Sequence, residues 1–115
     1  EASRRGVDLV ALHTWSDVGG LPLQGEEWRT RKQEAEEILA ERLAGWQERY
    51  PDVKVRRHVE FDEPARQLVD RSGTAQLVVV GSHGRGGFSG MLLGSVSSAV
   101  VQSVDVPVTV VRPRD

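Results

Sequence analysis

The 115-residue sequence contains no cysteine, which excludes disulfide bonds and metal sites built on thiolates. It also lacks a secretory signal pattern and any apolar run of the roughly 18 residues that a transmembrane helix needs. The sequence also lacks a large excess of either charge, because the formal net charge is −2 and acidic and basic residues are interspersed. A broad basic surface for nucleic acid is therefore not expected. These absences predict a cytoplasmic protein that binds neither membranes nor nucleic acids.

The residues that are present have the composition of one ordinary globular domain, with 38% hydrophobic and 28% charged residues. The apolar patterns predict strands over 7–15, 53–61, 77–80 and 108–111. They predict helices over 26–50, 63–72 and 95–104, the last with Ser95 as its N-cap. The apolar stripe of the helix over 26–50 includes Ala35, Trp46 and Tyr50.

The alternation of strands and helices predicts an α/β fold with an open, doubly wound parallel sheet and helices on both faces. The strand over 7–15 is expected to be buried, and the strand over 77–80 to be covered on both faces. Glu1 to Gly6 has the basic residues and the glycine that are typical of a helix end. A helix end without its start indicates that residues 1–115 form a single domain that lacks its first strand and most of its first helix.

A cluster of glycines follows the strand over 77–80, at positions 81, 84, 86, 87, 90 and 94. Glycine costs backbone entropy and provides no packing, so the cluster needs an explanation. Ligands of doubly wound sheets bind beyond the carboxyl ends of the strands, where this loop begins. Its backbone N–H groups and the start of the next helix suit a phosphate. Arg85 would add a positive charge, and Ser95 and Ser97 would add hydroxyl donors.

Two common phosphate-binding patterns do not fit this loop. Gly87 stands where a Walker loop needs lysine, and Ser89 stands at the third glycine position of a dinucleotide fingerprint. A phosphate would therefore bind in another geometry. A glycine-rich surface turn without a ligand remains the alternative, because glycine clusters alone are weakly specific.

The spacing Gly81-x2-Gly84-x9-Gly94-Ser95 resembles the nucleotide-binding signature of the universal stress protein family. The segments LVVVGSHGRGG, LLGSVSSAV, VPVTVVRP and GVDLVALHTW also resemble that family, so the resemblance covers essentially the whole chain. It implies the Rossmann-like, adenine-nucleotide α-hydrolase-like form of the α/β fold. The stretch EASRRGVDLVALH is similar to the second domain of tandem members from actinobacteria.

This resemblance implies an ATP site, with or without Mg²⁺. Its motif residues in this sequence are Thr14, Val80, Gly81, Gly84, Gly94, Ser95, Val96 and Ser97. The backbone of Thr14 would contact adenine, Val80 and Gly81 would lie against the ribose and adenosine, and the others would hold the phosphates. His83 and Arg85 match variable positions, so their roles are inferred from their place in the loop. Arg85 would add its charge to the phosphate site, and His83 would contact the phosphate or ribose, with a solvated loop residue as the alternative. The family's nucleotide-contacting aspartate belongs to the strand expected to be missing, in the centre of the sheet.

The remaining candidate side chains favour structural roles. His13 and His58 are isolated and do not form a metal site. Trp15 is expected to pack in the core, with base stacking as the alternative because it follows Thr14 at the edge of the site. Asp17 is expected to be a solvated loop residue, with a hydrated metal ion as the alternative.

Three functions agree with these observations. The first is an ATP-binding regulatory protein of the stress response that acts as a switch. The second is a ligand-free interaction module, a homodimer or a tandem pseudo-dimer that pairs through Val108–Val111 as an edge strand. The third is a slow ATP hydrolase or phosphotransferase. No nucleophile has an evident neighbouring base, so at most weak ATPase activity is expected and no catalytic residue is assigned.

Overall fold

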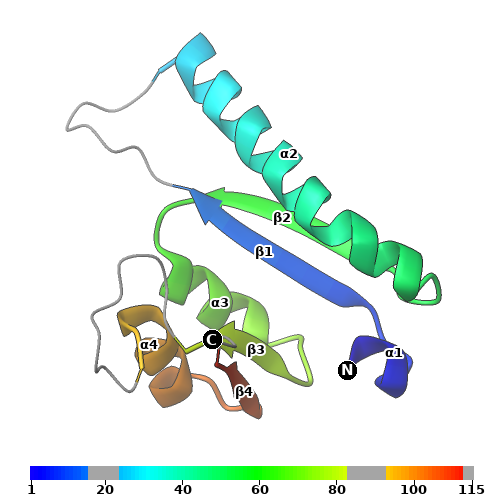
Figure 1. The fold of residues 1–115 in the computed structure, drawn as a ribbon. Helices are drawn as coiled ribbons and strands as arrows, with labels where there is room; N and C mark the ends of the chain where they lie inside the picture. Colours follow the sequence, from blue (N-terminus) through cyan, green and yellow to red (C-terminus); the bar gives the residue numbers. More distant parts are fainter. Residues whose placement is uncertain (16–23, 83–92, 113–115) are drawn as a thin grey trace. The chain divides into compact units, whose positions relative to one another are not determined.

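The computed structural model describes residues 1–15, 24–82 and 93–112. Helices and strands alternate along the described chain (Figure 1). In order they are α1 (Ala2–Arg5), β1 (Leu9–Trp15), α2 (Glu26–Arg49), β2 (Val55–Phe61), α3 (Pro64–Ser72), β3 (Val78–Gly81), α4 (Ser95–Ser103) and β4 (Val108–Val111). The predicted alternation is confirmed, and β4 has the bounds that the sequence predicts.

The described strands form two parallel pairs. β1 pairs with β2 in a register that runs from Leu9 opposite Val55 to Trp15 opposite Phe61. β3 pairs with β4, from Val78 opposite Val108 to Gly81 opposite Val111. Parallel neighbours need a crossover connection, which contains α2 in the first pair and α4 in the second. The pairs belong to two compact units, Glu1–Asp62 and Glu63–Asp115. The predicted strand in the centre of one larger sheet stays a prediction.

The first unit packs α2 along β1 and β2 (Figure 1). Ala35 is buried, as its place in the apolar stripe predicts. The burial predicted from the stripe is wrong at its C-terminal end, because 56% of Trp46 is exposed and Tyr50 is also exposed. A helix of this length extends about 36 Å and a seven-residue strand about 23 Å, so the sheet does not cover all of α2. The Arg49 guanidinium lies over the rings of both exposed aromatic residues, 5.0 Å and 5.8 Å from their centroids.

The second unit has its core on one face of the β3–β4 pair. Val78 and Val80 of β3 and Val100 of α4 are buried together. Ala65 and Leu68 of α3 also pack against this cluster, so both helices cover the same face.

Two predictions of burial are therefore wrong. Within the described residues of the second unit, α3 and α4 cover β3 on one face, and 52% of Val79 is exposed on the other. Its side chain points away from Val78 and Val80 because successive residues of a strand face opposite sides. Leu9 and Val10 at the start of β1 are also exposed. An apolar strand sequence does not identify which of its faces a helix covers.

The backbone is left-handed at two consecutive non-glycine residues between β2 and α3. Asp62 has φ 55° and Glu63 has φ 50°. This conformation costs about 1–2 kcal/mol per residue with a side chain. The predicted helix end at residues 1–6 is confirmed, and there the left-handed position is a glycine, Gly6, at φ 66°.

Replacing Glu63 by glycine should stabilise the second unit. We expect Glu63→Gly to raise the free energy of unfolding by about 1 kcal/mol, because it removes the side chain that disfavours the left-handed backbone. The exposed ion pair with Arg66, at 2.9 Å, offsets little of this gain. The control is Glu41→Gly on the exposed surface of α2, which should lose about 1 kcal/mol. Urea unfolding measures the free energy of unfolding of both variants. Equal losses of this free energy in the two variants would contradict the conformational argument.

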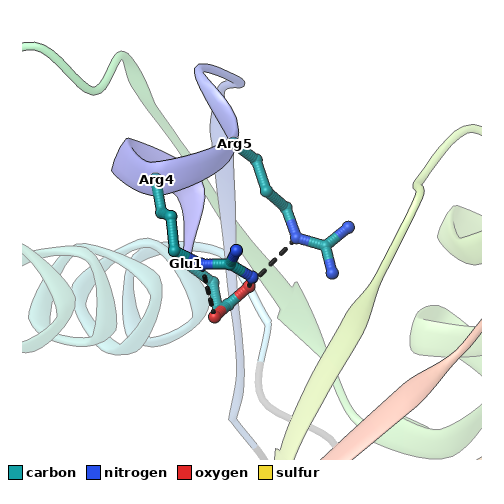
Figure 2. A network of polar contacts seen from close by, with 3 residues as sticks. All are labelled: Glu1, Arg4 and Arg5. Carbon is teal, nitrogen blue, oxygen red and sulfur yellow. Dashed lines mark hydrogen bonds and ion pairs between the residues drawn. The ribbon is translucent and has the colours of Figure 1, made fainter.

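A small ionic network holds the first turn of the chain. The Glu1 carboxylate accepts hydrogen bonds from Arg4 at 2.7 Å and from Arg5 at 3.0 Å (Figure 2). The bond from Arg4, followed by that from Arg5, lowers the pKa of the Glu1 carboxyl to about 2. A carboxyl whose pKa is depressed on folding stabilises the folded state above its unfolded pKa of 4.5.

The contribution of the Glu1 carboxylate to the stability of the folded state should therefore be complete above pH 4.5 and should disappear as the pH falls through about 2. An NMR titration of the Glu1 side-chain carboxyl should show a midpoint near 2. In Arg4→Gln the midpoint should rise, because the larger of the two hydrogen-bond effects is removed. A midpoint that is the same in both proteins would show that Arg4 does not hold the carboxylate.

Candidate functional site

The candidate site lies where β3 ends and α4 begins. Gly81 is the last residue of β3, and Gly94 precedes α4 with an extended backbone, φ −69° and ψ 166°. Gly94 is therefore the N-cap, and the prediction that Ser95 has this role is wrong by one residue. Ser95 already has a helical backbone, so its side chain stands beside the helix start instead of capping it.

A single peptide group connects the three elements of this site. Its carbonyl belongs to Gly81 and accepts a hydrogen bond from the Ser97 hydroxyl. Its N–H belongs to Ser82 and donates to the carbonyl of Val111 in β4 at 2.8 Å. The next carbonyl, that of Ser82, accepts the Gly94 N–H at 2.6 Å. These bonds attach the start of α4 to the end of β3, and the same peptide attaches β3 to β4.

The residues at this junction differ in their exposure to solvent. Ser82 and Ser97 are buried, with 1% and 4% of their surface exposed, and Val80 and Gly94 are also buried. Ser95 is exposed. The serine hydroxyls that the sequence treats alike therefore differ. Ser97 bonds to the protein backbone, and Ser95 faces the surroundings.

The start of α4 offers backbone N–H groups to an anion. The first intrahelical bond runs from the Ser98 N–H to the Gly94 carbonyl at 2.9 Å. The amides of Ser95, Val96 and Ser97 precede that bond, and among the described residues no side chain caps the helix. Amides at this position and the helix dipole both favour a negative charge.

Sequence reasoning missed Ser82 as a residue of this junction. Its amide and carbonyl each join β3 to another element, and its side chain is almost completely buried. The available signal was a serine directly after the glycine that ends an apolar strand, but serine is common in surface loops. His83, Gly84 and Arg85 lie outside the described residues, and their predicted roles stay predictions.

Thr14 belongs to the first unit, where it is half-buried and lies opposite Glu60 in the β1–β2 register. The next residue, Trp15, packs against two other rings. Its centroid lies 4.8 Å from that of Trp28 and 4.9 Å from that of Phe61. Trp28 and Phe61 are themselves 5.0 Å apart. This three-ring cluster agrees with a packing role for Trp15. Asp17 lies outside the described residues.

Within residues 1–15, 24–82 and 93–112, no group of three or more histidine, aspartate or glutamate side chains could hold a metal ion. The helices in these same ranges include none that is both long and apolar enough to cross a bilayer.

The sequence profile of the Universal stress protein family matches residues 1–112. The chain belongs to this family. It is 67% identical over 114 residues to a universal stress protein of Mycolicibacterium smegmatis. That match covers 99% of this chain, which spans 39% of the relative's length.

Solved structures with similar folds have low sequence identity to the chain. Universal stress protein UspA from Lactobacillus plantarum is 18% identical with a TM-score of 0.67, over 96% of this chain and 81% of that one. A universal stress protein solved in complex with cAMP is 19% identical with a TM-score of 0.58, over 98% of this chain and 79% of that one. These likenesses confirm the predicted fold class, a Rossmann-like α/β fold with parallel strands.

Proposed function

We propose that this universal stress protein chain is an ATP-binding regulatory protein of the stress response. The observation that carries the proposal is the start of α4, where three amides precede the first helical bond and the neighbouring peptide is fixed to β3 and β4. A phosphate chain suits such a group of oriented N–H donors. The exposed Ser95 hydroxyl adds a donor beside them.

The family resemblance implies how the rest of the nucleotide would lie. Phosphates would contact the Gly84 and Gly94–Ser97 segments, with His83 and Arg85 beside them. The ribose would lie near Val80 and Gly81. The contact of the Thr14 backbone with adenine, which the family resemblance implies, stays a prediction. The family neighbour solved with cAMP supports a nucleotide ligand for this fold. Mg²⁺ would reach the site with the phosphates, because phosphate oxygens are ligands that it prefers.

Regulation fits the described side chains better than catalysis. Activation of a serine needs a neighbouring general base. The Ser97 hydroxyl instead donates to a backbone carbonyl, and Ser72 likewise donates to the Val69 carbonyl at 2.6 Å. These hydroxyls are not activated as nucleophiles, and we propose a switch that holds nucleotide, with hydrolysis absent or slow. We also propose that it acts in the cytoplasm.

We also propose that a further strand completes the sheet of this domain. Isolated pairs of strands are marginally stable in water, and each described pair leaves apolar strand residues exposed. The strand would supply the partner for the open edge of one pair, and with it the aspartate that the family resemblance implies.

Isothermal titration with ATP and Mg²⁺ tests the nucleotide site. We expect ATP to bind and Ser95→Ala to weaken binding by about three- to tenfold, because one hydrogen bond to phosphate is lost. The matched control is Ser98→Ala, three residues along α4, where the hydroxyl accepts a bond from Gln102 at 3.2 Å. Equal affinity in all three proteins would exclude the Ser95 hydroxyl as a phosphate ligand, and a starting chain that binds no ATP would contradict the proposed nucleotide site. Phosphate release measured in the same samples distinguishes a holder of ATP from a slow hydrolase.

An interaction module is the second candidate, and exposed apolar residues of the β3–β4 pair favour it. Val79 and Val111 are about half exposed on the face that α3 and α4 leave uncovered. β4 would pair with its counterpart in a homodimer or in a tandem pseudo-dimer, and this face would be covered at the same time.

Sedimentation velocity tests this association. We expect Val111→Lys to shift a dimer towards monomer, because a desolvated lysine opposes burial of the face. The control is Val101→Lys on α4, also an exposed valine, which should leave the distribution unchanged. A monomeric starting protein, or an equal response of the two variants, would count against association through this face.

A further inference from the structure

Ser97 has a hydroxyl that the proposed phosphate site does not need as a ligand. The residue lies on α4, and its hydroxyl donates to the carbonyl of Gly81, sixteen positions earlier in the chain. A hydroxyl has one hydrogen, so this bond uses its donor capacity. Only 4% of Ser97 is exposed, and its side chain is directed into the protein. The backbone N–H of Ser97 remains among the amides at the start of α4.

We propose that Ser97 is a positioning residue, whose hydroxyl fixes the first turn of α4 so that its amides are preorganised for phosphate. This inference rests on the proposed nucleotide site. It assigns the hydroxyl to the protein backbone and leaves contact with the ligand to the amides and to Ser95.

The hydrogen bonds around Ser97 explain why one hydroxyl can have this effect. Among the described residues, one bond from the Ser97 hydroxyl to the Gly81 carbonyl and one from the Gly94 N–H to the Ser82 carbonyl attach α4 to the end of β3. The two donors, Gly94 and Ser97, are three residues apart and lie at the two ends of the helical turn that contains the amides. With both bonds the turn is fixed at its beginning and at its end, whereas with the Gly94 bond alone it is fixed at one point.

The accepting group makes the bond costly to lose. The Gly81 carbonyl shares its peptide plane with the Ser82 N–H, which donates to Val111 at 2.8 Å. That ladder bond restricts rotation of the peptide, so the carbonyl keeps its direction when the hydroxyl is removed. The bond from Ser97 to this carbonyl is partly buried, so a carbonyl left without its donor is unfavourable until α4 moves or water enters. Either change displaces the amides from the arrangement that the anion needs, and preorganisation is lost.

The test compares four proteins: the starting chain, Ser97→Ala, Ser97→Thr and the control Ser98→Ala. Each is titrated with ATP and separately with adenosine, which lacks the phosphates. We expect Ser97→Ala to weaken ATP by about tenfold while adenosine changes by less than about twofold, and Ser97→Thr to recover most of the loss because it keeps the hydroxyl. Ser98→Ala should bind both ligands like the starting chain.

Unchanged ATP affinity in Ser97→Ala would overturn the inference. Equal losses for ATP and adenosine would also overturn it, because they indicate a general weakening of the fold and no specific effect on the phosphate amides.

Amide hydrogen exchange without ligand separates this inference from the proposed function. The Gly94 and Ser82 amides should exchange faster in Ser97→Ala than in the starting chain or in Ser98→Ala. If the starting chain binds no ATP, the proposed function fails. Faster exchange would then still support Ser97 as the residue that holds the helix start, and unchanged exchange would overturn that role as well.

Discussion

The Gly81–Ser82 peptide is the group on which the candidate site depends. Its carbonyl accepts the Ser97 hydroxyl from α4, and its N–H donates to Val111 in β4. A peptide group is rigid, so elements bonded to its two sides are held in a fixed relation to one another. The polar junction is anchored in the valine core of Val78, Val80 and Val100 directly beside it. The position of the amides at the start of α4 is thus stabilised by packing of this valine core and by the hydrogen bonds at the end of β3.

The first unit uses a different means to support the corresponding strand end. At the carboxyl ends of β1 and β2, the rings of Trp15 and Phe61 pack against Trp28 of α2. The Asp62 N–H donates to the Trp15 carbonyl at 2.7 Å and closes the pair. Aromatic packing buries a large apolar area and favours particular ring geometries, which stabilises this end of the pair. Thr14, whose predicted contact with adenine stays a prediction, directly precedes this cluster.

The sequence predicts the elements well because their signals are local. β4 follows Pro107 and is rich in valine, and α1 is followed by Gly6, which adopts the left-handed backbone. Side-chain burial depends on tertiary packing and was predicted less well. Val79 has the same apolar character as Val78 and Val80, yet only the latter two face α3 and α4.

The same distinction applies to the site. The motif spacing places Gly81, Gly94 and Ser95 at one junction, and the structure brings these residues to the end of β3 and the start of α4. The spacing does not distinguish Ser95 from Ser97, because the two hydroxyls differ only in which side of the helix start they occupy. It also gives no sign of Ser82, whose backbone amide and carbonyl bond to Val111 and Gly94.

The central claim is that phosphate binds the amides at the start of α4, and it is tested most directly by two-dimensional ¹⁵N NMR of the labelled chain. ATP and then adenosine would be added while the Ser95, Val96 and Ser97 amide signals are followed. The account predicts that ATP shifts these signals strongly and that adenosine leaves them nearly unchanged. Shifts with ATP that occur elsewhere and spare these three amides would contradict it.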